Sequence, residues 1–201
     1  TRTGDIQACM VTGDRNDIRG RLLAFVDGTA WCRALPASKG RLKHLGQTIA
    51  RMNAAMSHIV HPATKRTHHW DLSQAGRHRS AISDINDPDR RQILEWMFHL
   101  HAAIAQPIFD RLPRSLIHGD INDDNILVEN DRVCGILDFG DCLENPTVCD
   151  LAIALAYHTL DESDPLEAAA HIIGGYHGIR PLNDDEMTVL FVLMCTRMAV
   201  S

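Results

Sequence analysis

The sequence lacks the features of membrane and secreted proteins. Its 201 residues contain no run of 18 or more apolar residues, and no basic stretch followed by an apolar one opens the chain. A membrane-spanning helix needs about 20 apolar residues, and a secretory leader needs the second pattern. We therefore expect a cytoplasmic protein without a membrane partner. The first residue is not Met, and the last apolar run, 190–200, carries no stop signal, so we expect the chain to be cut from a longer one at both ends.

Basic clusters and paired cysteines are also missing. Lys and Arg number 20 against 26 Asp and Glu, which gives a formal net charge of −6. Nucleic-acid binding requires clustered Lys and Arg, so we expect no nucleic-acid partner and favour a cationic or zwitterionic small molecule as substrate.

None of the 6 cysteines forms a C-x-x-C pair, and several lie in apolar runs, where Cys behaves as a small hydrophobic residue. We expect free thiols.

The pattern along the chain predicts an α+β, mostly helical fold. Residues 6–12 and 21–26 have strand character and flank a turn cluster, which predicts a hairpin. Helical apolar spacing predicts one core helix over about 40–60 after an N-cap at Ser38, and a second from Asp87 to Pro107. Residues 61–86 are expected to form loops and short helical turns, and short strands are expected within 115–141. After Pro146 the chain reads as helical, with N-caps predicted at Thr147, Asp164 and Asn183.

The candidate chemistry lies between residues 118 and 138. Asp120 and Asn125 are placed on a loop between two predicted strands, and Asp138 follows 13 residues after Asn125. Phosphoryl transfer needs a carboxylate beside the acceptor hydroxyl and Mg²⁺ to neutralise the phosphates. Asp120 fits the first role, while Asn125 and Asp138 offer the oxygen ligands that Mg²⁺ prefers. A hairpin over 125–139, with its turn at 129–132, would bring these two ligands together.

These motifs resemble the aminoglycoside phosphotransferase and choline kinase superfamily, whose fold is protein-kinase-like. The resemblance rests on His118-Gly119-Asp120 with Asn125, on residues 136–141, and on residues 150–152. Protein kinases have Arg at the position of Gly119, and no Ala-Pro-Glu segment follows here, which favours the small-molecule branch. The fold implied is a protein-kinase-like C-lobe with a remnant of the N-lobe sheet.

The resemblance also implies roles for individual residues. Asp120 is the expected catalytic base, and Asn125 and Asp138 are the expected Mg²⁺ ligands, with ATP or GTP as the phosphoryl donor. His118 and Asp150 are expected to brace the catalytic loop. We group His118 with the catalytic residues and take Asp150 as structural support for the loop.

The N-terminal part resembles the end of an N-lobe. Residues 21–28 look like its last strand and the hinge, where Phe25 and Val26 would contact the nucleotide base. We expect 1–28 to be the end of the N-lobe and 29–201 to be the C-lobe. The superfamily needs a phosphate-covering loop and a strand lysine, and nothing before Arg21 supplies either. We therefore expect this chain by itself to be inactive.

Finer features look most like the hydroxylysine kinase group, which includes bacterial relatives joined to aminotransferase domains. This likeness rests on 117–141, 174–176 and 180–182, and it implies a hydroxylated amine as substrate. Asp141 and Glu144 are candidates for attracting the substrate ammonium group, because they follow Asp138 on the acceptor side, although ordinary surface acids are the default in a chain of this charge. The alternatives are a choline, homoserine or aminoglycoside kinase, or a non-catalytic kinase-like module of a multidomain protein. The 12 histidines lack the ligand spacing of zinc sites.

Overall fold

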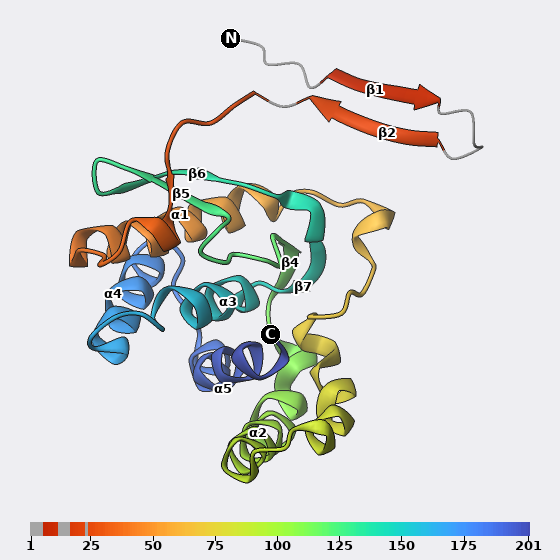
Figure 1. Ribbon diagram of the computed structural model, residues 1–201, viewed down its shortest axis with the longest axis vertical. Helices are drawn as coiled ribbons and strands as arrows, with labels where there is room; N and C mark the ends of the chain where they lie inside the picture. The colour runs from red at the N-terminus through yellow and green to blue at the C-terminus, as the bar shows by residue number, and fades with distance from the viewer. Residues whose placement is uncertain (1–5, 12–16, 23) are drawn as a thin grey trace.

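The computed structural model describes the backbone of residues 6–11, 17–22 and 24–201, and side chains from residue 24 onward. The predicted α+β, mostly helical fold is confirmed (Figure 1). The main helices are α1 (Lys39–Met56), α2 (Pro88–Leu100), α3 (Val148–His158), α4 (Pro165–His177) and α5 (Asp184–Val200). The longest 3₁₀ segment is Leu72–Asp84, within the region expected to hold loops and short helical turns.

The strands in the described part of the chain form three small antiparallel sheets. β1 (Ile6–Val11) pairs with β2 (Asp17–Leu22), β3 (Thr29–Ala30) joins β5 (Ile126–Glu129) and β6 (Arg132–Ile136), and β4 (Arg114–Ile117) pairs with β7 (Leu143–Pro146). The N-terminal hairpin is confirmed, but the expected second strand at 21–26 is wrong. Pairing over six residues of β1 needs a partner that begins at Asp17, inside the region read as a turn.

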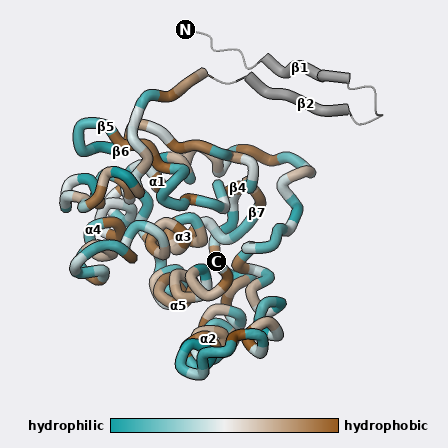
Figure 2. Tube along the Cα trace, viewed as in Figure 1, coloured by the Kyte–Doolittle hydropathy of each residue, from teal (hydrophilic) through white to brown (hydrophobic). Residues whose placement is uncertain are grey.

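The core lies between two helix pairs. α1 packs on α4 and α3 packs on α5, with the apolar side chains of α3 almost wholly buried. Apolar colours run along α3 and α5 in Figure 2, at the centre of the helical part. The predicted first helix and its Ser38 cap are confirmed, because the Ser38 side chain accepts a hydrogen bond from the Arg41 N–H.

The second predicted core helix needs a correction. α2 begins at the expected Asp87 cap, but only Phe98 is buried, and Ile93 is 54% exposed. α2 contacts α5 and the short helices of residues 72–84 and 101–105, so it lies at the periphery and belongs to a small satellite cluster with Ala75 and Ile82. Its apolar stripe is therefore only partly covered, since Leu94, Met97 and Leu100 are half-buried and Ile93 is exposed.

Two of the three later N-caps are confirmed. Asp164 accepts hydrogen bonds from two backbone N–H groups, and Asn183 forms a capping box with Glu186. Thr147 occupies the predicted N-cap position of α3, but its side chain makes no capping hydrogen bond. Its hydroxyl instead hydrogen-bonds to the Ser115 hydroxyl of β4 at 2.8 Å.

The close packing of α1 on α4 gives a test of the fold. A Cβ added at Gly175 would lie 2.1 Å from the Lys43 carbonyl oxygen, whereas one at Gly174 would meet nothing within 4 Å. We expect Gly175→Ala to lower the free energy of unfolding by about 1–3 kcal/mol through overpacking. Gly174→Ala is the matched control and should raise it by up to about 1 kcal/mol, since Ala favours a helix. Urea denaturation measures both, and equal stability of the two variants would contradict this helix contact.

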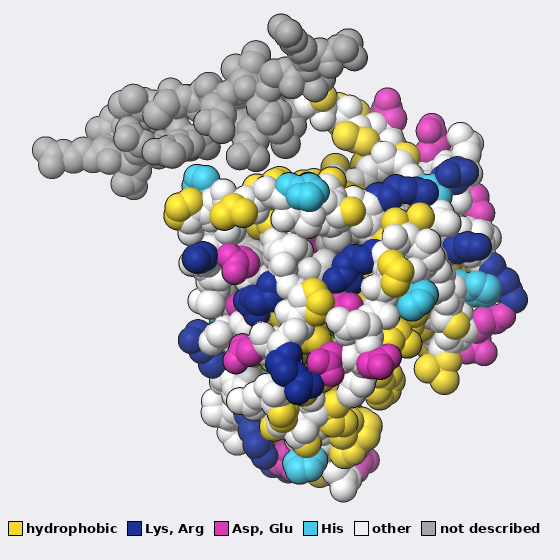
Figure 3. Space-filling model, turned by 180° about the vertical axis from the view of Figure 1, so that it is seen from behind, with side chains coloured by type: hydrophobic (Ala, Val, Ile, Leu, Met, Phe, Trp, Pro, Cys, Tyr) yellow, Lys and Arg dark blue, Asp and Glu magenta, His cyan; other side chains and the backbone are white. Residues whose placement is uncertain are grey.

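The surface and the cysteines agree with the composition. Basic and acidic side chains are interspersed on the face shown in Figure 3. Cys32, Cys134, Cys142, Cys149 and Cys195 are free, which confirms the free-thiol expectation for the cysteines whose side chains are described. No helix in the described part of the chain combines the length and apolar character needed to cross a membrane.

Candidate active site

The loop of residues 118–125 connects β4 to β5 and carries most of the predicted site. His118 and Gly119 donate their backbone N–H groups to the two carboxylate oxygens of Asp150, at 3.0 and 2.9 Å. Gly119 has φ of +83°, and a Cβ there would lie 2.8 Å from the Asp141 carbonyl oxygen. Glycine is required here because other residues disfavour this backbone conformation and the loop passes so close to residue 141.

Asp150 is anchored by a buried polar chain that crosses three helices. It lies in the first turn of α3, and the Asn53 side chain of α1 donates to it at 2.6 Å. The Tyr176 hydroxyl of α4 in turn donates to the Asn53 side-chain oxygen at 2.9 Å. Burial raises the pKa of the Asp150 carboxyl, while its hydrogen bonds from Gly119, His118 and Asn53 act in the opposite direction. The carboxylate thereby links the 118–125 loop to the helical core.

The His118 ring is fixed by hydrogen bonds on both sides. Its Nδ1 accepts from the Asp120 N–H at 3.2 Å, so the proton lies on Nε2, which donates to the Leu137 carbonyl oxygen at 2.8 Å. The ring also meets Phe139 edge-on, with 4.7 Å between ring centroids. His118 therefore ties the loop to the segment that leads into Asp138.

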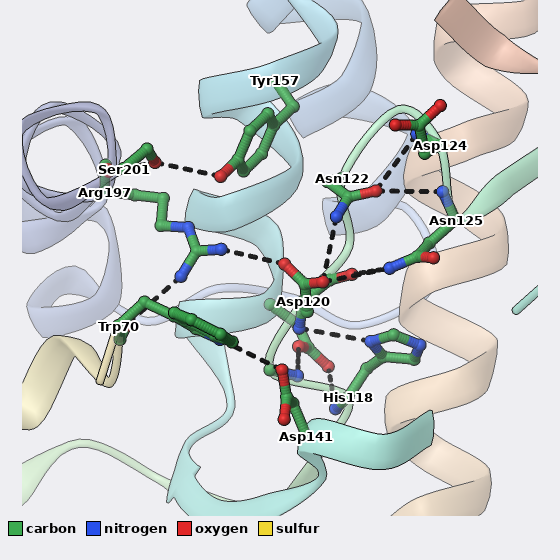
Figure 4. A network of polar contacts seen from close by, with 12 residues as sticks. Trp70, His118, Asp120, Asn122, Asp124, Asn125, Asp141, Tyr157, Arg197 and Ser201 are labelled. Atoms are coloured by element: carbon green, nitrogen blue, oxygen red, sulfur yellow. Dashed lines mark hydrogen bonds and ion pairs between the residues drawn. The ribbon is translucent and has the colours of Figure 1, made fainter. Parts of the chain in front are cut away.

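Asp120 is surrounded by donors. Its Oδ2 accepts from the side chains of Asn122 at 2.9 Å and Asn125 at 3.1 Å. Its Oδ1 accepts from Arg197 Nη2 at 2.9 Å (Figure 4). The Asp120 side chain keeps 18% of its surface exposed, whereas Arg197 keeps 4%. The carboxylate is thus held in place and still reachable from solvent.

The predicted hairpin is present as β5 and β6, and it places Asn125 and Asp138 at its open end. The Asn125 carbonyl oxygen accepts the Leu137 N–H at 2.8 Å, and Ile126 lies opposite Ile136 in the sheet. The turn at the other end contains Asn130 and Asp131, both with positive φ, which is typical of tight hairpin turns.

The two predicted metal ligands have free oxygens. The Asn125 amide nitrogen donates to Asp120, so its side-chain oxygen points elsewhere. Asp138 has φ of +53°, and its Oδ1 accepts the Gly140 N–H at 3.0 Å, which leaves Oδ2 without a hydrogen bond from the described residues. Among the described residues, no three His, Cys, Asp or Glu side chains form a group that could hold a metal ion. One carboxylate and one amide nevertheless fit Mg²⁺, which commonly takes its remaining ligands from phosphates and water.

One of the two predicted substrate acids lies beside this loop. The Trp70 indole N–H donates to Asp141 Oδ2 at 3.1 Å, and Arg197 Nη1 donates to the Trp70 carbonyl oxygen at 3.1 Å. Glu144 lies in β7 opposite Leu116, and its carboxylate forms no hydrogen bond or ion pair with the described residues. The structure thus groups Asp141 with Asp120 and leaves Glu144 outside this network (Figure 4).

The predicted hinge residues are exposed. Phe25 has 89% of its surface exposed and Val26 has 39%. A Cβ added at Gly135 would lie 2.9 Å from a Val26 methyl group, so Val26 runs against β6. Both side chains are available for contact with another group.

Arg197 and Asn53 are among the residues of the site that were not identified from the sequence. Arg197 is the one charged residue in the apolar run 190–200, and Asn53 is a polar residue at a buried position of α1. A lone polar residue within an apolar helical pattern is the signal that could have indicated both, because such a group requires a buried partner.

The hairpin, the 118–125 loop and its helical support define a protein-kinase-like lobe. Residues 9–182 match the family model described as "Phosphotransferase enzyme family", and the chain belongs to this family. The resemblance noted from its motifs is therefore confirmed.

Known proteins similar to this chain include several kinases. Hydroxylysine kinase of Xenopus laevis is 28% identical, over 90% of this chain and 52% of that protein. A homoserine kinase of Methylobacillus flagellatus is 28% identical over 71% of this chain and 43% of that protein. The microcompartment-associated aminopropanol kinase structure has a TM-score of 0.66, with 16% identity over 95% of this chain and 61% of that one. The chain spans about half the length of the hydroxylysine kinases it matches.

Proposed function

We propose that the protein transfers the γ-phosphoryl group of ATP or GTP to a hydroxyl of a small hydroxylated amine, with Mg²⁺ as cofactor. One observation carries this proposal. The amide nitrogen of Asn125 is held by Asp120, which leaves its side-chain oxygen without a hydrogen bond from the described residues, and Asn125 and Asp138 both lie at the open end of the hairpin. That arrangement supports a base and two metal ligands in neighbouring positions.

Each residue has a distinct part in the proposed reaction. Asp120 orients the acceptor hydroxyl and takes its proton as the oxygen attacks the γ-phosphorus in line, while the bond from the γ-phosphorus to the bridging oxygen breaks and ADP or GDP leaves. Asn125 and Asp138 hold Mg²⁺, which when bound offsets the charge on the phosphate oxygens. His118 and Asp150 keep the loop in register through the hydrogen bonds described above. Phe25 and Val26 contact the nucleotide base. They lie in the proposed end of the N-lobe, residues 1–28, and residues 29–201 form the C-lobe.

The amine preference is supported by Asp141 and by the relatives. Asp141 Oδ2 accepts from Trp70, whose carbonyl oxygen accepts from Arg197, and the other Asp141 oxygen forms no hydrogen bond with the described residues. The names hydroxylysine kinase, homoserine kinase and aminopropanol kinase all denote hydroxylated amines. We propose a hydroxylysine-like acceptor, a cytoplasmic protein, and an association with an aminotransferase domain, as the resemblance implies.

A substrate panel tests this function. The full-length protein is incubated with Mg²⁺ and either ATP or GTP, together with hydroxylysine, homoserine, aminopropanol, choline or an aminoglycoside, and phosphorylated product is measured by mass spectrometry. We expect product with at least one amino alcohol. If no acceptor is phosphorylated and titration detects no Mg²⁺ binding, the chain is a non-catalytic kinase-like module.

A further inference from the structure

Arg197 is the strongest feature of the site that the proposed roles leave unused. It lies in the last turn of α5, beyond the residues matched by the family model. Its guanidinium donates to Asp120 and to the Trp70 carbonyl oxygen, and its carbon atom Cζ lies 5.4 Å from the centre of the Tyr157 ring. A cation with 4% of its side chain exposed is thus held by three contacts (Figure 4).

The hydrogen bonds of Asp120 indicate where an acceptor hydroxyl can bind. Each carboxylate oxygen offers about two lone-pair positions. Two side-chain amides, of Asn122 and Asn125, occupy those of Oδ2. Among the described residues Arg197 alone donates to Oδ1, so one position remains there. The hydroxyl therefore shares Oδ1 with the guanidinium of Arg197.

We propose that Arg197 is a positioning residue, which aims Asp120 so that its Oδ1 receives the acceptor hydroxyl and which makes catalysis depend on helix α5. This inference rests on the proposed function. The cation acts through Asp120 and not on the substrate, because its Nη1 is engaged by Trp70 and its Nε is buried. Without Arg197, the Asp120 side chain keeps its amide donors on Oδ2 but loses the contact that fixes its rotation.

The chain offers a matched control in Arg41. Arg41 makes the same three kinds of contact, to the Asp131 carboxylate at 2.8 Å, to the Ala34 carbonyl oxygen, and over the Trp31 ring at 5.7 Å. Asp131 lies in the hairpin turn, at the opposite end of the hairpin from Asn125. Arg41→Met therefore removes an equivalent set of contacts without touching Asp120.

The test compares Arg197→Met and Arg41→Met in the full-length protein at saturating nucleotide and acceptor. We expect Arg197→Met to lower kcat by about 10²-fold, the loss typical of a reacting group displaced by about 1 Å. Nucleotide KM, measured in a separate nucleotide titration, should stay within about threefold, because Arg197 acts through Asp120 in the proposed mechanism. Arg41→Met should keep kcat within about twofold of wild type, although we expect it to lower the melting temperature by about as much as Arg197→Met does.

A double-mutant comparison separates positioning from a purely structural role. In an Asp120→Asn background, Arg197→Met should change the residual kcat by no more than about twofold, since effects of residues that act as a unit are not additive. If Arg197→Met does not fold, Arg197→Lys is the second variant. Its ammonium keeps the charge but reaches only one of the two acceptors of Arg197, Asp120 Oδ1 or the Trp70 carbonyl oxygen. We expect kcat to fall by about tenfold, and we expect no such fall when Asp120→Asn is already present.

The outcomes are distinct. A wild-type kcat in Arg197→Met, or a full additional loss in the Asp120→Asn background, would overturn the positioning role while leaving the proposed function intact. A wild-type protein that phosphorylates no acceptor would overturn the proposed function and this inference with it.

Discussion

Asp120→Asn in the full-length protein is expected to lower kcat by about 10²–10⁴-fold, the usual contribution of a general base. The amide keeps the shape of the side chain, and its oxygen can still accept the hydrogen bonds from Asn122 and Asn125. Its NH2 group then faces the Arg197 guanidinium, so the contact with Arg197 is lost while the contacts within the loop are retained. The amide can no longer take a proton from the acceptor hydroxyl. Steady-state kinetics with the best acceptor of the panel measure kcat, and a nucleotide-binding titration should remain within about twofold of wild type.

Asp124→Asn is the matched control, because Asp124 belongs to the same loop and is exposed. Its carboxylate accepts only from the Cys32 thiol among the described residues, at 3.2 Å, away from the hydrogen bonds of Asp120. We expect kcat within about twofold of wild type, the range of surface substitutions remote from the reacting groups. Equal kcat values for the two variants would remove Asp120 from the role of base.

The site residues that could be predicted are those joined by local geometry. Asn125 and Asp138 are separated by one hairpin, so a correct prediction of two short strands and a tight turn was enough to bring them together. The same holds for the helix caps at Ser38, Asp164 and Asn183, where the side chain and its partners lie within three residues of one another.

The contacts that could not be predicted span the chain. Arg197 meets Asp120 across 77 positions and Asn53 meets Asp150 across 97. These pairings depend on how α5 and α1 pack on α3, which periodicity does not specify. Thr147 shows the same limit, since a hydroxyl from β4 competes with the helix for its side chain.

The exposure of α2 has a related cause. Its apolar spacing is helical and its cap is correct, yet spacing cannot say whether another element covers the stripe. In the structure its neighbours are α5 and two short helical segments, which bury Phe98 and leave Ile93 exposed. Helix existence was therefore predictable here, whereas burial was not.

Asp138→Asn is expected to separate metal binding from base catalysis. Asn tolerates the positive φ of residue 138, and its side-chain oxygen can still accept the Gly140 N–H, so the local fold should persist. The loss of the negative charge weakens the hold on Mg²⁺. A bound metal contributes several kcal/mol to the reaction, so we expect kcat to fall by about 10²-fold or more.

The distinguishing measurement for this variant is the Mg²⁺ concentration that gives half-maximal rate. In Asp138→Asn it should rise by about tenfold or more, because removing a ligand charge weakens a metal site. In Asp120→Asn it should stay near the wild-type value, since Asp120 binds neither metal nor nucleotide in the proposed mechanism. An unchanged Mg²⁺ requirement in Asp138→Asn would mean that the oxygens at the open end of the hairpin do not hold the metal. Asp120 would then have to act beside a metal site formed by other residues.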